Sequence, residues 1–248
     1  MTTPSPPAAP GAEYLAVAAR VADLRRRIEA ACARAGRDVG EVTLIGAGKR
    51  QPLERLRAAA AAGVAVFGEN VVQEAAEKVP RLPAGLDWHF IGTLQSNKAR
   101  AAVELFSAVH SIDRLKIAHA LERHAREADR RLLGFLQVHL GGEPGKHGFP
   151  EEPEAFAAAV RPLAELERIE VVGLMAIPPF EEEPERQRAW FRALRALRDR
   201  LAADPAWRRF RGWLSMGMSD DFEIAVEEGA THVRVGTALF GPREEARA

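Results

Sequence analysis

Apolar positions along this chain follow two alternating patterns, one with the spacing of helices and one with the spacing of strands. The first pattern covers residues 13–35, where Leu15, Ala18 and Ala22 recur at helical spacing. Gly36 follows as a helix-stop signal. This segment therefore predicts a long helix ahead of the first strand.

The rest of the chain alternates between short β-rich runs and helical patterns. The predicted strands span residues 42–47, 64–67, 87–91, 106–110, 132–138, 169–175, 212–216 and 232–235. The predicted helices span residues 52–62, 70–79, 95–104, 113–129, 151–166, 184–202 and 220–228. Such alternation is typical of a parallel α/β sheet. Eight strands favour a single closed (β/α)8 TIM barrel with an extra N-terminal helix, and an open doubly wound sheet is the main alternative.

No break in composition divides the chain, so a single domain over residues 13–248 is expected. Residues 1–12 are rich in Pro and Ala, which predicts a disordered lead. This lead lacks the basic region and apolar core of a secretory signal. No apolar run approaches the length that crosses a bilayer.

Charge and cysteine content narrow the class of function. Lys plus Arg and Asp plus Glu number 35 each, which gives no electrostatic basis for a nucleic-acid or membrane partner. The single cysteine, Cys32, excludes an internal disulfide and fits a reducing compartment. A cytoplasmic protein is therefore expected.

Polar and small residues follow several of the predicted strands. In a barrel these positions share one face, where active and binding sites form. Lys49 follows the first strand in "VTLIGAGKR", and Asn70 follows the second. "SMGMS" at 215–219 and "GTALFG" at 236–241 follow the seventh and eighth strands, whose loops commonly hold a phosphate in such barrels.

Hydroxyl groups in these last two loops are candidate phosphate donors. Ser215, Ser219 and Thr237 supply them, while neighbouring glycines let the backbone approach an anion. Ser219 or Asp220 alternatively caps the next helix. The carboxylates of Asp220 and Asp221 would repel a phosphate, so their side chains are expected to point away from it.

Other site motifs fit the sequence poorly. "GAGKRQ" has Gln51 where a dinucleotide-binding turn needs a small residue, and "GGEPGKHGF" has His147 where a P-loop needs Ser or Thr. The histidines show no metal-binding spacing, and Ser215 lacks the glycine that precedes a nucleophilic serine in hydrolases. His89, inside an apolar strand, is expected to be packed or hydrogen-bonded rather than a base.

Lys49 then remains as a reactive amine. A lysine at a barrel mouth can become nucleophilic toward a carbonyl when it is desolvated. A phosphate held by the last two loops and an amine at Lys49 would together fit a phosphorylated aldehyde. Pyridoxal 5′-phosphate (PLP) is such a molecule.

Several long motifs resemble the pyridoxal phosphate homeostasis family. They are "FGENVVQE" (67–74), "WHFIGTLQSNK" (88–98), "HSIDRLKIA" (110–118), "GGEPGKHGF" (141–149), "GLMAIP" (173–178) and "LSMGMSDDFEIAVEEGATHVRVGTALFG" (214–241). The resemblance runs from about Val42 to Gly241. It implies a barrel like the alanine racemase N-terminal domain, and a monomer.

The resemblance also implies roles for individual residues. Lys49 would hold PLP as a Schiff base, with Asn70 beside the cofactor and Arg234 facing the pyridine nitrogen. The residues implied at the phosphate are Ser215, Gly236 and Thr237, together with Met216 and Ser219. The family usually has Ser, Thr or Lys, His and Asn where this chain has Gly48, Arg50, Thr93 and His139.

Two features favour a cofactor holder over a PLP enzyme. Arginine only donates hydrogen bonds, so Arg234 favours the unprotonated pyridine nitrogen and a weaker electron sink. A racemase also needs a second proton carrier, and the one tyrosine, Tyr14, lies in the leading helix. The chain ends seven residues beyond Gly241, so no further domain is expected to supply one. The expected function is PLP homeostasis, with possible delivery to apo-enzymes, and the alternative is a racemase-like PLP enzyme.

Overall fold

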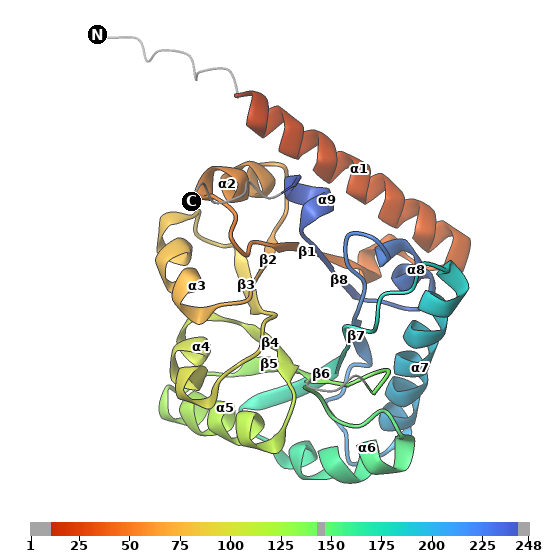
Figure 1. Ribbon diagram of the computed structural model, residues 1–248. Helices are drawn as coiled ribbons and strands as arrows, with labels where there is room; N and C mark the ends of the chain where they lie inside the picture. Colours follow the sequence, from red (N-terminus) through yellow and green to blue (C-terminus); the bar gives the residue numbers. More distant parts are fainter. Residues whose placement is uncertain (1–10, 143–146, 243–248) are drawn as a thin grey trace.

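The eight strand-like runs form eight parallel strands that close into one barrel (Figure 1). This computed structural model describes residues 11–142 and 147–242. Each strand pairs with its neighbours in chain order, and Thr43 of the first strand pairs with His232 of the last. The TIM barrel is confirmed, and the open doubly wound sheet is excluded.

The strands follow the predicted order with small shifts in their limits. They are β1 (Thr43–Ala47), β2 (Val66–Glu69), β3 (Asp87–Phe90), β4 (Ala108–Ile112), β5 (Leu132–Gln137), β6 (Ile169–Met175), β7 (Trp213–Ser215) and β8 (His232–Val235). β2 and β4 each begin two residues later than predicted. Val64 and Phe106 are buried, but their N–H groups bond to Ala59 and Ala102 at the preceding helix ends rather than to a strand.

Helices surround the barrel, and most lie in the predicted intervals. They are α1 (Ala12–Ala35), α2 (Leu53–Ala61), α3 (Val72–Lys78), α4 (Ala99–Leu105), α5 (Leu115–Glu127), α6 (Pro153–Val160), α7 (Pro184–Ala203), α8 (Phe222–Glu227) and α9 (Thr237–Phe240). The described residues also form the 3₁₀ turns η1 (Val39–Glu41), η2 (Val79–Arg81), η3 (Ser96–Lys98) and η4 (Arg161–Glu165). The sequence did not indicate α9.

The extra N-terminal helix lies across the outside of the barrel. α1 packs against α2, α8 and α9 (Figure 1). Val17, Val21 and Leu24 are buried in these contacts. Leu15 and Ala22, which the sequence pattern singled out, are exposed instead, so the helix was predicted correctly but its buried face was not. Gly36 ends the helix with a left-handed φ of 65° and donates to the carbonyl of Ala33.

Two predicted helices are divided by local geometry. The interval 95–104 contains η3 followed by α4, and the interval 151–166 contains α6 followed by η4, where Pro162 supplies no N–H. Of the predicted disordered lead, residues 1–10 lie outside the described residues, and Ala12 already belongs to α1. The single-domain assignment of residues 13–248 stays a prediction.

The barrel interior contains an unexpected polar group. His89, His110 and His232 lie together inside it. The rings of His110 and His232 also pack against Phe135, and the centroids of His110 and Phe135 are 4.1 Å apart. His89 is buried and hydrogen-bonded, as the sequence indicated. Among the described helices, none is both long and apolar enough to cross a membrane.

Candidate functional site

A cavity of about 270 Å³ lies at the C-terminal ends of the strands. This volume is close to the lower end of the about 300–1,000 Å³ that is typical of small-molecule sites. The residues that line the cavity are Ala47, Lys49, Gln51, Asn70, Ile91, Ile177, Met218, Ser219, Asp220, Arg234, Gly236 and Thr237. Six of the eight residues predicted from the sequence are in this set: Lys49, Asn70, Ser219, Arg234, Gly236 and Thr237.

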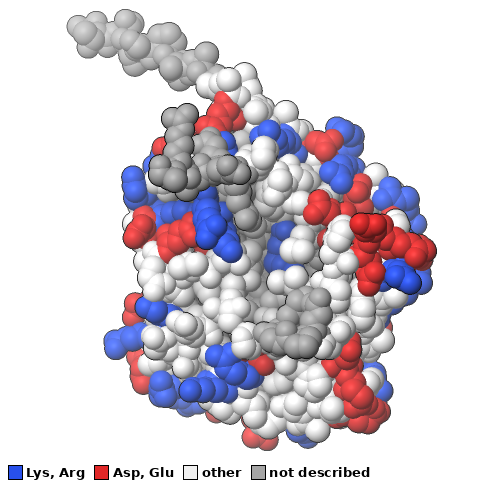
Figure 2. All heavy atoms as spheres, in the orientation of Figure 1, with Lys and Arg blue, Asp and Glu red and all other residues white. Residues whose placement is uncertain are grey.

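The surface of the molecule shows how charge is distributed in this view. In Figure 2, uncharged residues surround a hollow near the centre of the face. Basic and acidic side chains are interspersed around its edge, and neither sign covers the face.

Lys49 lies in a tight turn that begins directly after β1. The N–H of Gln51 donates to the carbonyl of Gly48 over 2.9 Å, which closes the turn around Lys49. Gly48 in turn donates its N–H to the carbonyl of Gly68 in β2, over 2.8 Å. The turn is thus anchored to the sheet, and the half-buried Lys49 lies on the cavity.

A lysine from α3 holds the same turn from outside the cavity. Lys78 Nζ donates to the carbonyl oxygen of Gly48 over 2.7 Å and pairs with Glu74 Oε1 at 2.6 Å. Glu74 Oε1 also accepts the backbone N–H of Arg50 over 2.6 Å. The backbone on both sides of Lys49 is therefore tied to one ion pair. No motif in the sequence indicates this role, although Glu74 and Lys78 have the i, i+4 spacing of a helical ion pair.

A buried carboxyl group completes this cluster. Glu69, the last residue of β2, is fully buried, and its Oε1 lies 3.0 Å from Lys78 Nζ. Its Oε2 has no hydrogen-bond partner among the described residues. Burial raises the pKa of Glu69 to about 7, although Lys78 acts in the opposite direction.

The cluster gives a physical reason for one departure from the family pattern. A Cβ atom at Gly48 would lie 2.6 Å from Glu69 Oε1 and 3.2 Å from Leu56. A serine at this position would therefore require the buried carboxyl to move. Glycine lets Glu69 and Lys78 approach the backbone next to Lys49.

Asn70 is positioned by a second glycine. A Cβ atom at Gly92 would lie 2.2 Å from the carbonyl oxygen of Asn70, a distance that no side chain can occupy. The ends of β2 and β3 are joined at the same place. Ile91, which follows β3, donates its N–H to the carbonyl of Glu69, the last residue of β2, over 2.9 Å. The backbone that carries Asn70 to the cavity therefore depends on Gly92.

Arg234 of β8 is the buried cation of the cavity. Its Nη1 donates to Ser215 Oγ over 2.7 Å, and its Nη2 donates to the carbonyl of Ala176 over 3.0 Å. Burial lowers the pKa of Arg234 to about 10, while the nearby charge of Asp221 acts in the opposite direction. The guanidinium is thus charged at neutral pH and acts only as a donor.

Ser215 and Met216 differ from their expected places. Both are fully buried, and neither is among the residues that line the cavity. The Ser215 hydroxyl lies 2.7 Å from both Arg234 Nη1 and His110 Nδ1, so it is engaged beneath the cavity. Met216 packs in the hydrophobic core. The Ser215 hydroxyl therefore does not face the cavity and is not placed to donate a hydrogen bond to a phosphate there.

Ser219 connects the loops after β7 and β8. Its Oγ accepts the backbone N–H of Ala238 over 3.2 Å, so it does not cap α8 as the alternative interpretation had it. Asp221 is turned away, as expected, since its carboxylate accepts bonds from Met218 N–H and Gln187 Nε2. Asp220 differs from the expectation, because it is among the residues that line the cavity.

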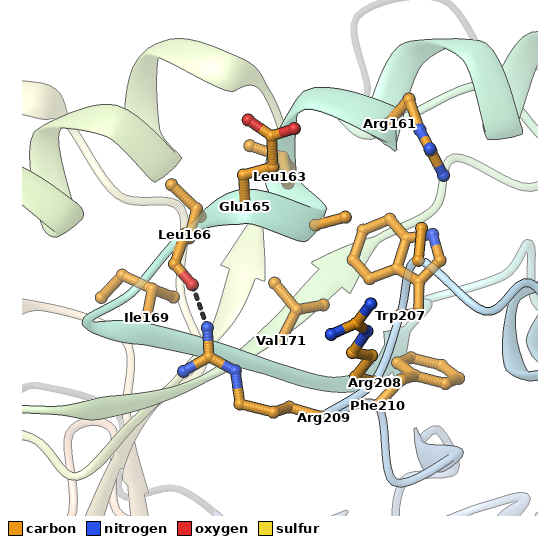
Figure 3. Close-up of a pocket in the computed structure, with 12 residues that line it drawn as sticks. Arg161, Leu163, Glu165, Leu166, Ile169, Val171, Trp207, Arg208, Arg209 and Phe210 are labelled. Carbon is orange, nitrogen blue, oxygen red and sulfur yellow. Dashed lines mark hydrogen bonds between the residues drawn. The ribbon is translucent and has the colours of Figure 1, made fainter.

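A second cavity, of about 350 Å³, lies near the start of β6, at the opposite end of the barrel (Figure 3). Trp207 and Phe210 line one side of it, and Arg209 donates to the carbonyl of Leu166. Arg161 pairs with Asp204 at 3.2 Å. None of the residues predicted to bind a ligand lies here. Arg161 and Arg209 bond to the protein itself, and the residues predicted from the sequence point to the first cavity.

Metal chemistry has no support within residues 11–142 and 147–242. No group of three or more His, Cys, Asp or Glu side chains there could hold a metal ion. The first cavity instead combines an amine, a buried guanidinium and several hydroxyl or backbone donors. This set of groups is suited to an anionic ligand that also carries a carbonyl.

Comparisons with known proteins agree with this chemistry. The family model described as the alanine racemase N-terminal domain matches residues 22–244. The pyridoxal phosphate homeostasis protein of Pseudomonas aeruginosa is 44% identical over 232 residues, which are 92% of this chain and 96% of that protein. Its counterpart in Aquifex aeolicus is 42% identical over 226 residues, 91% of this chain and 97% of that protein.

A solved structure adds a bound ligand in a similar protein. PipY of Synechococcus elongatus, with PLP bound, is 39% identical to this chain and has a TM-score of 0.78. The match covers 91% of this chain and all of that one.

Proposed function

Because this chain belongs to the pyridoxal phosphate homeostasis family, we propose that it binds PLP through Lys49. The barrel of this family is that of the alanine racemase N-terminal domain. The observation that carries the proposal is the meeting of Lys49, Arg234 and Thr237 on one cavity. These residues come from the ends of β1 and β8, far apart in the sequence.

The residues of the cavity fit this cofactor. When bound, PLP supplies an aldehyde, which condenses with a primary amine and releases one water molecule. Lys49 presents that amine from a turn held on both sides. Ser219, Gly236 and Thr237 lie where the last two loops meet and would hold the phosphate, and a Cβ atom at Gly236 would come no closer than 3.7 Å to its neighbours.

The other lining residues would orient the ring. Arg234 would face the pyridine nitrogen as a donor, because its guanidinium keeps its charge and cannot accept a hydrogen bond. Asn70 would lie beside the cofactor, on backbone that Gly92 holds in place. Ser215 would act indirectly, since its hydroxyl contacts Arg234 rather than the cavity.

We propose that PLP is held for homeostasis and delivered to apo-enzymes, without strong catalytic turnover. Two observations support this. Arg234 favours an unprotonated ring nitrogen, which withdraws electrons weakly. Tyr14, the single tyrosine of this sequence, lies on α1 and does not line the cavity, so this chain does not place a tyrosine where a racemase needs its second proton carrier. A cytoplasmic monomer that acts as one barrel domain completes the proposal.

The first experiment measures near-visible absorption of the purified protein before and after borohydride reduction. We expect an absorption band that is lost on reduction, with the added mass retained on a Lys49 peptide. Lys49→Ala should lose both. Lys116→Ala, at an exposed lysine on α5, is the matched control and should keep both.

Two results would change the proposal. If wild-type protein neither carries nor takes up PLP, the proposed function is wrong. If PLP binds but free amino acids exchange their α-proton for deuterium at the rate of a racemase, the protein is a PLP enzyme instead.

A further inference from the structure

A continuous chain of hydrogen bonds crosses the barrel interior beneath the proposed cofactor site. Its members are Arg234, Ser215, His110, His89 and Asp87. The distances along it are 2.7 Å from Arg234 Nη1 to Ser215 Oγ, 2.7 Å from Ser215 Oγ to His110 Nδ1, 3.0 Å from His110 Nε2 to His89 Nδ1 and 3.2 Å from His89 Nε2 to Asp87 Oδ2.

The two ends of this chain lie at opposite ends of the barrel. Arg234 is near the C-terminal end of β8 and lines the cavity. Asp87 is the first residue of β3, and its side chain is 49% exposed. Ser215 and the two histidines between these ends are buried. Of the whole chain, only Asp87 therefore reaches the solvent and only Arg234 reaches the cavity. Nothing in the proposed binding of PLP requires such a connection.

With both imidazoles neutral, the chemistry of the members fixes the direction of every bond. An ionised carboxylate only accepts, so His89 must donate to Asp87 from Nε2. A neutral imidazole that carries its proton on Nε2 accepts at Nδ1, so His110 must donate to His89 from its own Nε2. His110 Nδ1 then accepts the hydroxyl proton of Ser215, whose oxygen is left to accept from Arg234.

The charge states of Asp87 and His110 in this scheme agree with the surroundings of these two groups. Hydrogen bonding by His89 lowers the pKa of Asp87 to about 2, so the carboxylate is ionised at neutral pH. Ser107 donates to its other oxygen. Burial, together with the charge of Arg234, keeps the pKa of His110 well below its usual value, so this imidazole is neutral.

We propose that Asp87 is a positioning residue for Arg234, acting through His89, His110 and Ser215. Asp87 fixes the tautomers of both histidines, so the Ser215 hydroxyl must donate its hydrogen bond to His110 Nδ1. The Ser215 oxygen then accepts the hydrogen bond from the guanidinium. Arg234 is then pinned at Nη1 by Ser215 and at Nη2 by Ala176. Its remaining N–H groups are free to face the cofactor, a consequence that rests on the proposed function.

Asp87→Asn is the sharpest variant, because it keeps the shape of the side chain while adding a donor. An amide can donate to His89 Nε2, which permits the whole chain to reverse. In the reversed chain Ser215 Oγ accepts a hydrogen bond from His110 Nδ1–H, so its own O–H loses His110 as an acceptor and turns toward the guanidinium side. Asp129→Asn, at an exposed aspartate that pairs with Arg168, is the matched control.

The first measurement is nitrogen NMR of the histidine side chains in the protein without PLP. We expect His89 and His110 to carry their protons on Nε2 in wild type and in Asp129→Asn. Asp87→Asn should show a population with the proton on Nδ1. A proton on Nδ1 of either histidine in wild type would overturn the proposal, whatever the protein does with PLP.

The second measurement is PLP binding and the absorption maximum of the loaded protein. Asp87→Asn should raise the PLP dissociation constant about 3- to 10-fold, equivalent to about 0.6–1.4 kcal/mol, and should shift the absorption maximum. Unchanged affinity and spectrum would show that Asp87 does not position Arg234. If wild type has the expected tautomers but binds no PLP, the proposed function fails, and the positioning role fails with it.

Discussion

The ammonium group of Lys78 lies 2.7 Å from the carbonyl oxygen of Gly48, the residue that precedes Lys49. The same ammonium pairs with Glu69 and with Glu74, and Glu74 accepts the N–H of Arg50. The amine proposed to bind PLP therefore stands on a turn whose backbone is held by an ion-pair cluster behind it. This cluster links the stability of the protein to the geometry of the site.

Removing the cation of this cluster should destabilise the protein strongly. Lys78→Met would leave Glu69 buried without its counter-charge, and breaking a buried pair in this way costs about 3–5 kcal/mol of unfolding free energy. Urea denaturation at pH 8 would measure the loss. Lys116→Met, on the exposed face of α5, is the control and should change little. A loss below about 1 kcal/mol at pH 8 would contradict the assigned role of Lys78.

The ionisation of Glu69 should make stability fall as pH rises. Its pKa is about 7 in the folded protein and about 4.3 in an unfolded chain, so the folded state binds more protons between these values. The unfolding free energy therefore decreases as pH rises from about 4.3 to about 7. Glu69→Gln removes this contribution.

Denaturation curves from pH 4.5 to 8 would test this. The stability of Glu69→Gln relative to wild type should increase with pH up to about 7 and then stay constant. Parallel curves for the two proteins would show that Glu69 is already ionised across this range.

His232 should contribute the opposite dependence on the acid side. Burial lowers its pKa to about 3, whereas an unfolded histidine has a pKa of about 6.5. The unfolded state binds more protons between these values, so stability falls as pH drops below about 6.5, by up to about 1.4 kcal/mol per pH unit. In His232→Phe this contribution is absent.

The stability of His232→Phe relative to wild type should therefore improve steadily from pH 6.5 toward pH 4. Thermal or urea denaturation would measure it. His119→Phe, at an exposed histidine of α5, controls for the change in composition. A constant difference between His232→Phe and wild type would contradict the prediction.

Gly92→Ala should damage the cofactor site more than the fold. The added methyl group would meet the Asn70 backbone at 2.2 Å and push it from its place, at a cost of about 1–3 kcal/mol. We expect PLP affinity to fall about tenfold or more. Gly134→Ala, whose methyl group would meet the side chains of Ile112 and Ile169 away from the cavity, should lose stability while keeping PLP affinity.

Fluorescence or absorption titration with PLP would compare the two glycine variants. Equal losses of affinity in both would indicate a general effect of destabilisation rather than a displacement of Asn70.

Local patterns in the sequence determined the fold class and the place of the amine. The alternation of β-rich runs and helical patterns predicts parallel strands, because neighbouring parallel strands need a crossover connection, which is usually a helix. Lys49 follows the first strand, and the carboxyl ends of parallel strands meet at one face. Its position on the cavity therefore required no tertiary information.

The tertiary structure alone decided which way the buried polar groups point. β7 is short and buried, so the residues Trp213–Ser215 show no alternation that could tell whether Ser215 faces the cavity or the barrel interior. The same holds for His110, in a strand that is buried throughout. Ser215 and His110 are 105 positions apart in the chain, and only closure of the barrel brings them within 2.7 Å. Helix packing likewise places Lys78 beside Gly48, a contact that no local pattern encodes.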